Sequence, residues 1–473
     1  MVIYLVASLV SGVLTGLCFD FPAFSFLIWF SLVPFFYVVA SSKIPQGLLC
    51  SFVFGLTYYG TAIFWIGIVT KLGLVCLLLY LTLYSLLLLL VGKYLLKKNL
   101  AIISLPCLWV ILEFLKENVW CGFGWANLGY SQFRNIFLIQ EIDLFGTKFL
   151  SFLVVMVNVF IYEIVFVKKF SIKKVVLVCT LLVSCLLYSF HRMSTLKESD
   201  SLTVSLVQPN ISQELKWQDE FAPYIVKRLK GLGRQAQGGS LLIFPEAAWP
   251  DILDDNNTYL LEKFIRELDR VSLIGAVKKE EGAFYNTALL VDRDGQIQTV
   301  YRKIKLVPFG EYIPLRASLG FIDVINAIGD ISRGDEYTTF AYKGRYFSVL
   351  ICFEDIFPLF VSRFSQKSDF MVNVTNDAWF GGEPEASQHL GIMVMRAIEN
   401  RISIVRCANT GISGWVSFKG QTNTLEKHQR SVLFPDVGNF TISLHSKRSF
   451  YNRYGEFFPF VCAVFLLGVV IRR

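Results

Sequence analysis

Acidic residues are almost absent from the first 192 positions of the chain. Only six of the 37 aspartates and glutamates stand there: Asp20, Glu113, Glu117, Glu141, Asp143 and Glu163. The chain is 54% hydrophobic with a mean hydropathy of +0.52, which is too apolar for an ordinary soluble protein. This distribution excludes a single water-soluble domain. It predicts an apolar part at 1–192, a water-soluble part at 193–453 and an apolar tail at 454–473.

The residues that metal sites and disulfide frameworks need are also missing. No CxxC pair occurs and the four histidines are scattered, so we expect no metal and no cofactor. Eight of the ten cysteines lie in or beside apolar segments, where they act as small hydrophobes: Cys18, Cys50, Cys76, Cys107, Cys121, Cys179, Cys185 and Cys462. The net charge is +8, but no basic stripe interleaved with aromatic residues marks the soluble part, so we expect no nucleic-acid partner.

Eight apolar stretches approach the length of a membrane-spanning helix, which needs about 20 mostly apolar residues. They lie at 2–19, 24–42, 47–69, 72–96, 101–119, 146–167, 174–190 and 456–471. The first stretch lacks a basic leading region and a cleavage site of small residues, so we expect a retained helix and not a signal peptide. The sequence thus predicts seven transmembrane helices before the soluble part and one after it.

The basic residues between these stretches predict their orientation. If the N-terminus is cytoplasmic, the cytoplasmic side holds Lys43, Lys97, Lys98, the lysines of 168–174, Arg472 and Arg473. The short loops of the other side hold Lys71, Lys116, Arg134 and Lys148. This bias places the soluble part outside the membrane and both termini in the cytoplasm.

Two of the N-terminal acids, Glu113 and Glu163, lie within apolar stretches. An ionisable group inside a membrane is a functional hypothesis by default. Both acids stand near the ends of their stretches with a lysine close by, Lys116 and Lys168. We therefore expect their carboxylates to reach the membrane interface.

The soluble part alternates strand-like apolar runs with helical stretches. The runs lie at 202–207, 241–244, 271–277, 287–291, 347–351, 370–374 and 402–405, and helical stretches include 260–268 and 388–400. About 260 residues of this kind are enough for one α/β domain with a substantial core.

Three short motifs at strand ends carry residues that acyl transfer needs. Pro245-Glu246 follows one apolar run, Lys303 stands in a loop at 301–314, and Cys352 follows another apolar run. Acyl transfer without histidine requires a thiol nucleophile, a base for its proton and a cation for the oxyanion. Cys352, Glu246 and Lys303 are a sufficient set, and we expect the lysine to lower the thiol pKa from about 8.5. Taken singly, each residue also fits a purely structural role.

In their order, these motifs resemble the nitrilase (carbon–nitrogen hydrolase) superfamily. The segments at 208–217, 375–381, 396–411 and 122–132 extend the likeness, and the whole chain resembles the apolipoprotein N-acyltransferase family of bacterial envelopes. The resemblance implies a polytopic α-helical membrane domain plus a nitrilase-like αββα sandwich. It also implies a multi-pass protein of the bacterial inner membrane with its catalytic domain on the periplasmic side.

The same resemblance implies a role for each site residue. Glu246 is the general base, Lys303 the oxyanion stabiliser and Cys352 the nucleophile. Two further acids support the triad, and three aromatic residues line the substrate entrance: Glu311 and Glu354, and Trp217, Phe353 and Trp379. Three positions depart from the family's pattern: Ala247, Lys305 and Cys407. We expect them to affect substrate preference and not activity, with Cys407 as a small core residue.

The implied reaction has two steps. Cys352 attacks a phospholipid acyl ester, and the α-amine of the lipid-modified N-terminal cysteine of a lipoprotein attacks the resulting thioester. The partners are then a phospholipid donor, diacylglyceryl-modified lipoproteins and the bilayer. Two alternatives stay open: a membrane-tethered nitrilase-type amidase or hydrolase, for which one helix would suffice, and a non-catalytic envelope scaffold, which would not need the triad.

Five large aromatic residues stand in loops close to the motifs: Trp249, Phe309, Tyr312, Trp379 and Phe380. One hypothesis is that they turn inward and cap the core. The other is that they form a mobile, membrane-facing mouth that admits acyl chains and shields the thioester from water.

Overall fold

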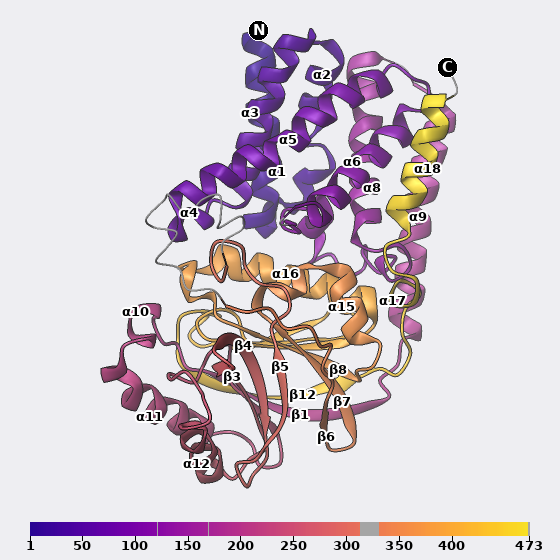
Figure 1. The fold of residues 1–473 in the computed structure, drawn as a ribbon. Coiled ribbons are helices and arrows are strands. Elements are labelled where there is room, and N and C mark those ends of the chain that lie inside the picture. Colours follow the sequence, from indigo (N-terminus) through magenta and orange to yellow (C-terminus); the bar gives the residue numbers. More distant parts are fainter. Residues whose placement is uncertain (121, 169, 313–330, 472–473) are drawn as a thin grey trace. The chain divides into compact units, whose positions relative to one another are not determined.

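The computed structural model describes residues 1–120, 122–168, 170–312 and 331–471 (Figure 1). Six residues used in the sequence predictions lie outside the described residues: Cys121, Lys169, Ile313, Pro314, Arg472 and Arg473. The chain divides into two units, Met1–Leu196 with Ser449–Arg473, and Lys197–Arg448. Unit 2 is thus inserted into unit 1 along the sequence.

Unit 1 is helical. Its α-helices are α1 (Val2–Asp20), α2 (Val33–Ser41), α3 (Ile44–Ala62), α4 (Ile66–Val69), α5 (Lys71–Leu95), α6 (Ala101–Asn118), α7 (Ile142–Phe145), α8 (Thr147–Tyr162), α9 (Ile172–Thr195), α17 (Phe450–Tyr454) and α18 (Phe458–Ile471). Shorter turns are η1 (Pro22–Trp29), η2 (Leu128–Gln132) and the π-helical η3 (Glu163–Val167).

Five helical stretches of the described residues are long and apolar enough to cross a membrane. They are Val2–Asp20, Ala23–Ser41, Lys71–Leu95, Thr147–Val167 and Ile172–Thr195. The other three predicted spans correspond to α3, α6 and α18. Helix α3 is rich in glycine, threonine and tyrosine, α6 carries three charged residues, and α18 has only 14 residues. The membrane character is therefore supported, and the count of eight spans stays a prediction.

Two glycines of α1 allow it to lie close against α3. A Cβ at Gly12 would lie 2.7 Å from the carbonyl oxygen of Phe54, and one at Gly16 would lie 2.8 Å from that of Tyr58. Small residues spaced four apart commonly let membrane helices approach closely. The spacing of these glycines thus explains why α1 packs on α3.

One face of α6 holds the non-helical segment that follows this helix. Glu113 Oε1 accepts hydrogen bonds of 2.9 Å from Trp109 Nε1 and from the backbone N–H of Leu128, and Lys116 Nζ donates to the carbonyl of Trp125 at 2.6 Å. Both charged side chains are buried. The predictions that Glu113 reaches the interface and that Lys116 lies in a short loop are therefore wrong. Residues three apart share one helix face. Here the side chains of that face form hydrogen bonds with backbone groups that are shielded from water.

Lys148 was also predicted in a short loop, and this too is wrong. It lies in α8, buried, and forms ion pairs with Glu117 of α6 and with Glu456, which precedes α18. Glu163 is 8% exposed, and its carboxylate pairs with Lys174 at 2.6 Å and not with Lys168. Buried charges of this kind are stable only when paired, so they fix which helices of unit 1 lie together.

Unit 2 contains two six-stranded sheets. The first has the order β12-β1-β2-β3-β4-β5, with β1 (Asp200–Gln208), β2 (Leu241–Ile243), β3 (Ser272–Glu280), β4 (Ala283–Val291), β5 (Ile297–Arg302) and β12 (Asp436–Leu444). The second has the order β11-β10-β9-β8-β7-β6, with β6 (Phe340–Tyr342), β7 (Arg345–Ile351), β8 (Phe370–Thr375), β9 (Ser403–Ala408), β10 (Gly414–Val416) and β11 (Thr422–Thr424). Strands β1, β2 and β3 are parallel, as are β7, β8 and β9, and the outer strands pair antiparallel.

Helices cover the outer faces of the two sheets (Figure 1). They are α10 (Gln213–Lys216), α11 (Ala222–Gly233), α12 (Thr258–Leu268), α15 (Pro358–Ser365) and α16 (Glu383–Asn400), with the 3-10 turns η4 (Asp219–Phe221), η5 (Cys352–Ile356) and η6 (Asp377–Trp379). Helices α11 and α12 share one apolar core with the first sheet, α15 and α16 contact the second, and β1 contacts β9 between the sheets. The layers run helix, sheet, sheet, helix, as the resemblance implies.

Candidate active site

Cys352 stands at a strained corner where β7 ends and η5 begins. Its φ is 52°, in the left-handed region that residues other than glycine rarely adopt. Asn373 Nδ2 donates to the Cys352 carbonyl at 3.0 Å, and Glu354 Oε2 accepts from the N–H of Ile351 at 2.8 Å. These two bonds hold the backbone on both sides of Cys352. The corner brings the cysteine, which is partly exposed, out of its strand.

Glu246 follows β2 in the first sheet, close against the neighbouring strand. A Cβ at Gly275 in β3 would lie 2.4 Å from the carbonyl oxygen of Pro245 and 2.7 Å from Glu246 Cα, so glycine is needed there. The buried Lys216 donates from Nζ to the Glu246 carbonyl at 3.2 Å. Ala247 has a φ of 45°, which turns the chain sharply after the acid. The Glu246 backbone is thus fixed from two sides.

Lys303, directly after β5, forms ion pairs with two of the predicted acids. Its Nζ lies 3.2 Å from Glu246 Oε1 and 3.0 Å from Glu311 Oε1. Burial lowers the pKa of Lys303, but Glu246 and Glu311 outweigh burial and raise that pKa above its ordinary value. The lysine therefore keeps its positive charge although it is 1% exposed.

Asn286 completes this arrangement, and the sequence predictions missed it. Its Nδ2 donates to Glu246 Oε1 at 2.8 Å and to Glu311 Oε1 at 2.9 Å. Asn286 is a buried polar residue in β4, between Tyr285 and Thr287. Buried amides need partners, so an asparagine directly before the strand-like run at 287–291 was the signal that could have pointed to it.

The resting thiol of Cys352 is less acidic than expected. Burial and the Glu246 charge raise the pKa of the thiol, and Lys303 and a hydrogen bond with Thr375 lower it less, so the pKa lies well above its ordinary value. Lys303 lowers the thiol pKa, as expected, but burial and the Glu246 charge outweigh it, so the resting group is a thiol. A base must therefore take the proton while the sulfur attacks.

Glu354 connects the loop of Lys303 with the corner of Cys352. Besides the Ile351 N–H, it accepts hydrogen bonds from Tyr301 Oη at 2.7 Å and from the N–H groups of Ile304 and Lys305 at 2.8 and 2.9 Å. Burial raises the pKa of Glu354 to about 7, against the lowering effect of these bonds. This acid shapes the site through backbone groups on both sides of it.

The predicted entrance residues are exposed or partly exposed. Trp217 is 46% and Trp379 50% exposed, and Phe353 is partly exposed with its ring 5.1 Å from that of Phe357. Exposed tryptophans on loops are available to an apolar substrate, whereas a core role would require them to be buried.

The five loop aromatic residues do not all fit one of the two hypotheses, inward capping of the core or a membrane-facing mouth. Trp249 is 2% exposed and its ring packs 5.5 Å from Phe264, so it caps the core. Phe309 is 49% exposed, like Trp379, whereas Tyr312 and Phe380 are half-buried. Inward capping therefore accounts for Trp249 and leaves Phe309 and Trp379 open to solvent.

Two of the three residues that depart from the family pattern, Cys407 and Lys305, have structural contacts of their own. Cys407 in β9 is fully buried, and its thiol donates to the carbonyls of Val207 and Ile243 at 3.3 and 3.2 Å. Burial raises its pKa, so Cys407 is the core residue that was predicted. Lys305 Nζ lies 5.0 Å from the ring centre of Phe357, a cation–π distance.

A buried cluster of charged residues surrounds His389 in α16. Asp377, Glu385 and His389 place oxygen and nitrogen atoms within 4.8 Å of one another, as metal ligands would. However, Arg406 Nη2 lies 2.8 Å from Asp377 Oδ2 and 2.9 Å from His389 Nδ1. A guanidinium already supplies positive charge among these atoms, so the group is an ion-pair cluster. The sequence predictions missed it, because His389 and its partners are far apart along the chain.

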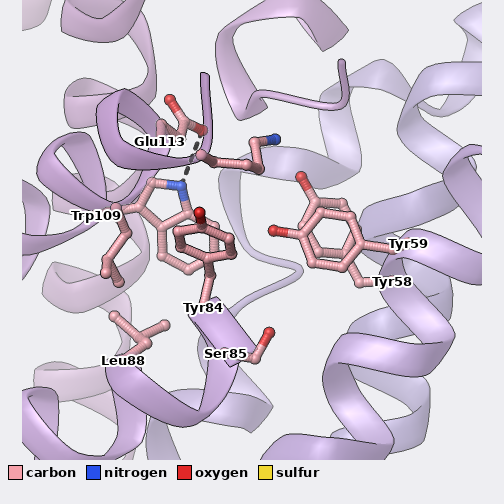
Figure 2. Close-up of a pocket in the computed structure, with 9 residues that line it drawn as sticks. Tyr58, Tyr59, Tyr84, Ser85, Leu88, Trp109 and Glu113 are labelled. Carbon is pink, nitrogen blue, oxygen red and sulfur yellow. Dashed lines mark hydrogen bonds between the residues drawn. The ribbon is translucent and has the colours of Figure 1, made fainter. Parts of the chain in front are cut away.

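Unit 1 has a pocket of its own between α3, α5 and α6 (Figure 2). Its cavity volume is only about 20 Å³, and it is lined by Tyr58, Tyr59, Tyr84, Ser85, Leu88, Trp109, Leu112, Glu113 and Lys116. Figure 2 shows the Trp109 indole directed at Glu113 on one side and the Tyr58 and Tyr59 rings on the other. None of the predicted site residues lines this pocket.

Two family matches together cover most of the chain. Residues 11–160 match the apolipoprotein N-acyltransferase N-terminal domain, and residues 203–435 match the carbon-nitrogen hydrolase family. Among solved structures, an amidase from Nesterenkonia sp. is 17% identical with a TM-score of 0.40, over 55% of this chain and 95% of its own.

Relatives match this chain over almost its whole length. The apolipoprotein N-acyltransferase of Geobacter metallireducens is 34% identical, over 99% of this chain and 95% of its own. The one from Chlorobaculum tepidum is 29% identical, over 96% of this chain and 93% of its own. Since the similarity extends through both units, the chain belongs to the apolipoprotein N-acyltransferase family.

Proposed function

We propose that this membrane protein transfers a fatty acyl group from a phospholipid to the α-amine of the lipid-modified N-terminal cysteine of a lipoprotein. The acyl group passes through a thioester on Cys352. The observation that carries the proposal is the charged Lys303, held between Glu246 and Glu311 and close enough to Cys352 to affect its pKa. This set supplies nucleophile, base and oxyanion stabiliser without histidine.

In the first step, the sulfur of Cys352 attacks the ester carbonyl of the phospholipid. Glu246 takes the thiol proton as the carbon–sulfur bond forms, and Lys303 stabilises the negative oxygen of the tetrahedral intermediate. When the intermediate collapses, the carbon–oxygen bond breaks and Glu246 returns the proton to the departing alkoxide. The products are a lysophospholipid and the Cys352 thioester.

In the second step, the neutral α-amine of the lipoprotein attacks the thioester carbonyl. Glu246 takes a proton from the amine nitrogen as the amide bond forms, and the sulfur leaves and recovers that proton. Lys303 again stabilises the oxyanion. Glu311 accepts a hydrogen bond from Lys303, and Asn286 donates to both Glu246 and Glu311. Their role is to hold the side chains of Lys303 and Glu246 in position.

The location we propose is the bacterial inner membrane, with unit 2 on the periplasmic side and both termini in the cytoplasm. The support is the bias of basic residues between the spans. Lys116 and Lys148 were counted on the outer side, but both are buried in helices and paired there. Without them, the outer loops keep only Lys71 and Arg134, and the bias becomes stronger.

One experiment separates this function from its rivals. The full-length protein in detergent is incubated with a phospholipid and a synthetic diacylglyceryl lipopeptide, and the products are followed by mass spectrometry. We expect lysophospholipid, an acyl adduct on Cys352 and an N-acylated lipopeptide. Free fatty acid as the only acyl product would favour the hydrolase alternative, and an unmodified Cys352 would favour the scaffold.

A further inference from the structure

Two chains of hydrogen bonds lead from the His389 cluster to Cys352. The first reaches the backbone of the nucleophile. His389 Nε2 lies 2.8 Å from Asp355 Oδ1, Asn373 Nδ2 donates to Asp355 Oδ2 at 3.2 Å, and the same Nδ2 donates to the Cys352 carbonyl at 3.0 Å. This carbonyl belongs to the residue with the left-handed φ, so the chain ends where the backbone is strained.

The second chain reaches the thiol itself. Thr375 forms a hydrogen bond with the Cys352 thiol, and its Oγ1 donates to Asp377 Oδ1 at 2.7 Å. The negative charge of Asp377 is one of the influences that raise the Cys352 pKa. Asp377 Oδ1 lies 3.8 Å from His389 Nδ1. The imidazole therefore faces the acid that acts on the thiol.

Charged groups from four elements face the His389 ring. Asp355 lies in η5, Asp377 in η6, Glu385 in α16 with Oε1 3.2 Å from Nδ1, and Arg406 in β9. Burial and the Arg406 charge lower the pKa of His389, but Asp355 and Glu385 outweigh them and raise it to about 9. The ring is therefore positive at neutral pH. Its charge opposes that of Asp377.

We propose that His389 is a positioning residue for the nucleophile, holding the Cys352 backbone through Asp355 and Asn373 and offsetting the Asp377 charge beside the thiol. This inference rests on the proposed function, since it treats Cys352 as the reacting group. It assigns two separable effects to one side chain. The backbone chain should affect how fast the thiolate reacts, and the charge should affect how much thiolate is present near neutral pH.

The test measures alkylation of Cys352 by iodoacetamide as a function of pH, on the full-length protein in detergent. Mass spectrometry of the peptide that contains Cys352 excludes the signal of other cysteines. His389→Gln keeps a donor for Asp355 but loses the positive charge. At pH 7–8 the His389 imidazole is still charged and the thiol is still protonated, so we expect alkylation of His389→Gln to be about tenfold slower there than that of the wild type. This difference should vanish above about pH 10, where His389 is neutral in the wild type as well. His389→Ala, which also lacks the donor for Asp355, should stay slower even there.

Asp377→Asn is the opposing variant, because it removes the charge that His389 offsets and keeps an oxygen for Thr375. We expect its alkylation at pH 7–8 to be faster than that of the wild type. Met393→Leu, at a buried position of the same helix, is the matched control and should follow the wild-type profile. Thermal unfolding of each variant shows whether it is folded.

An unchanged alkylation rate at pH 7–8 in folded His389→Gln would overturn the inference. If that variant does not fold, an unchanged rate in Asp377→Asn overturns it equally. Alkylation needs no lipid, so the outcome is independent of the proposed reaction. A wild-type protein that never acquires an acyl group from phospholipid would contradict that reaction and leave the His389 result standing.

Discussion

Burial decides how the Cys352 thiol behaves at this site. Burial and the Glu246 charge raise the pKa of the thiol more than Lys303 lowers it, and Lys303 is itself shared between Glu246 and Glu311. A thiol that stays protonated until substrate arrives is protected from oxidation and from wasteful alkylation. Its reactivity should therefore increase steadily with pH.

We expect the rate of Cys352 alkylation in the wild type to keep rising beyond pH 9. Its pKa lies well above the ordinary thiol value, so the thiolate fraction grows about tenfold per pH unit below that pKa. Iodoacetamide labelling of the Cys352 peptide across a pH series measures this. A plateau below pH 8 would show that Lys303 dominates and that the resting group is a thiolate.

Cys352→Ser should form no acyl-enzyme, because the hydroxyl lacks the nucleophilicity and acidity of a thiol. Cys407→Ala is the matched control, since Cys407 is buried between the sheets. Intact-mass measurement after exposure to phospholipid should show the acyl adduct in wild type and in Cys407→Ala only. Loss of the adduct in Cys407→Ala alone would reassign the nucleophile.

Asn286→Ala should slow acylation of Cys352 although residue 286 touches no predicted substrate group. It removes two hydrogen bonds to Glu246 and Glu311, and hydrogen bonds to charged groups contribute about 1.5–3 kcal/mol each. We expect Asn286→Ala to be acylated at least about tenfold more slowly than the wild type. The phospholipid concentration that gives half the maximal rate should change little. Lys303→Met should be worse, at about 10²–10³-fold, since one oxyanion donor is lost. Equal rates for wild type and Asn286→Ala would reduce this residue to a structural part of β4.

The motifs singled out Glu246, Lys303 and Cys352, because two of these residues follow apolar runs and Lys303 stands in a distinctive loop, all in a fixed order. The motifs did not predict Asn286 or the cluster around His389. Those groups act through contacts between residues distant in sequence, so their partners cannot be read from spacing. The lowering effect of Lys303 on the thiol pKa was predicted, but the burial that outweighs it was not. Burial depends on packing and does not follow from spacing along the chain.

At the scale of helices and strands, apolar runs were a good guide where elements are fully buried. All seven predicted runs coincide with strands, namely β1, β2, β3, β4, β7, β8 and β9. The runs missed β5, β6, β10, β11 and β12. Strands β6, β10 and β11 have only three residues each, and β5 and β12 are partly exposed and carry polar residues. In unit 1, the same reasoning misplaced Lys116 and Lys148, because hydropathy alone cannot show that two charged side chains meet partners inside a helical unit.

Gly12→Ala should destabilise unit 1, whereas Gly468→Ala should not. A Cβ at Gly12 would meet the Phe54 carbonyl of α3 at 2.7 Å, but one at Gly468 in α18 meets nothing within 4 Å. Overpacking of this kind costs about 1–3 kcal/mol, so the apparent melting temperature in detergent should fall for Gly12→Ala only. Identical melting of the two variants would show that α1 and α3 do not pack as described.

At the scale of the whole molecule, the proposed orientation can be tested without disturbing the fold. Gly238 is exposed in the turn before β2, and a Cβ there meets nothing within 4 Å. In intact cells, Gly238→Cys should react with a membrane-impermeant maleimide if unit 2 faces the periplasm as proposed. Lys98→Cys, between α5 and α6, should react only after the cells are broken. The parent protein, which carries the exposed Cys76 and Cys179, sets the background. The reverse pattern would overturn the orientation and the substrates with it.

The ion pairs of Lys148 impose an order on biosynthesis. Glu117 is near it in the chain, but Glu456 is made 308 residues later, after all of unit 2 has been translated. Until then, Lys148 of the nascent membrane unit can pair with Glu117 only, and α6 lacks the helix α18 that packs on it. A chain that stops before residue 456 already contains Glu246, Lys303 and Cys352, but its Lys148 lacks one of its two carboxylates and its α6 lacks α18. The membrane unit of such a chain is incomplete although unit 2 is whole.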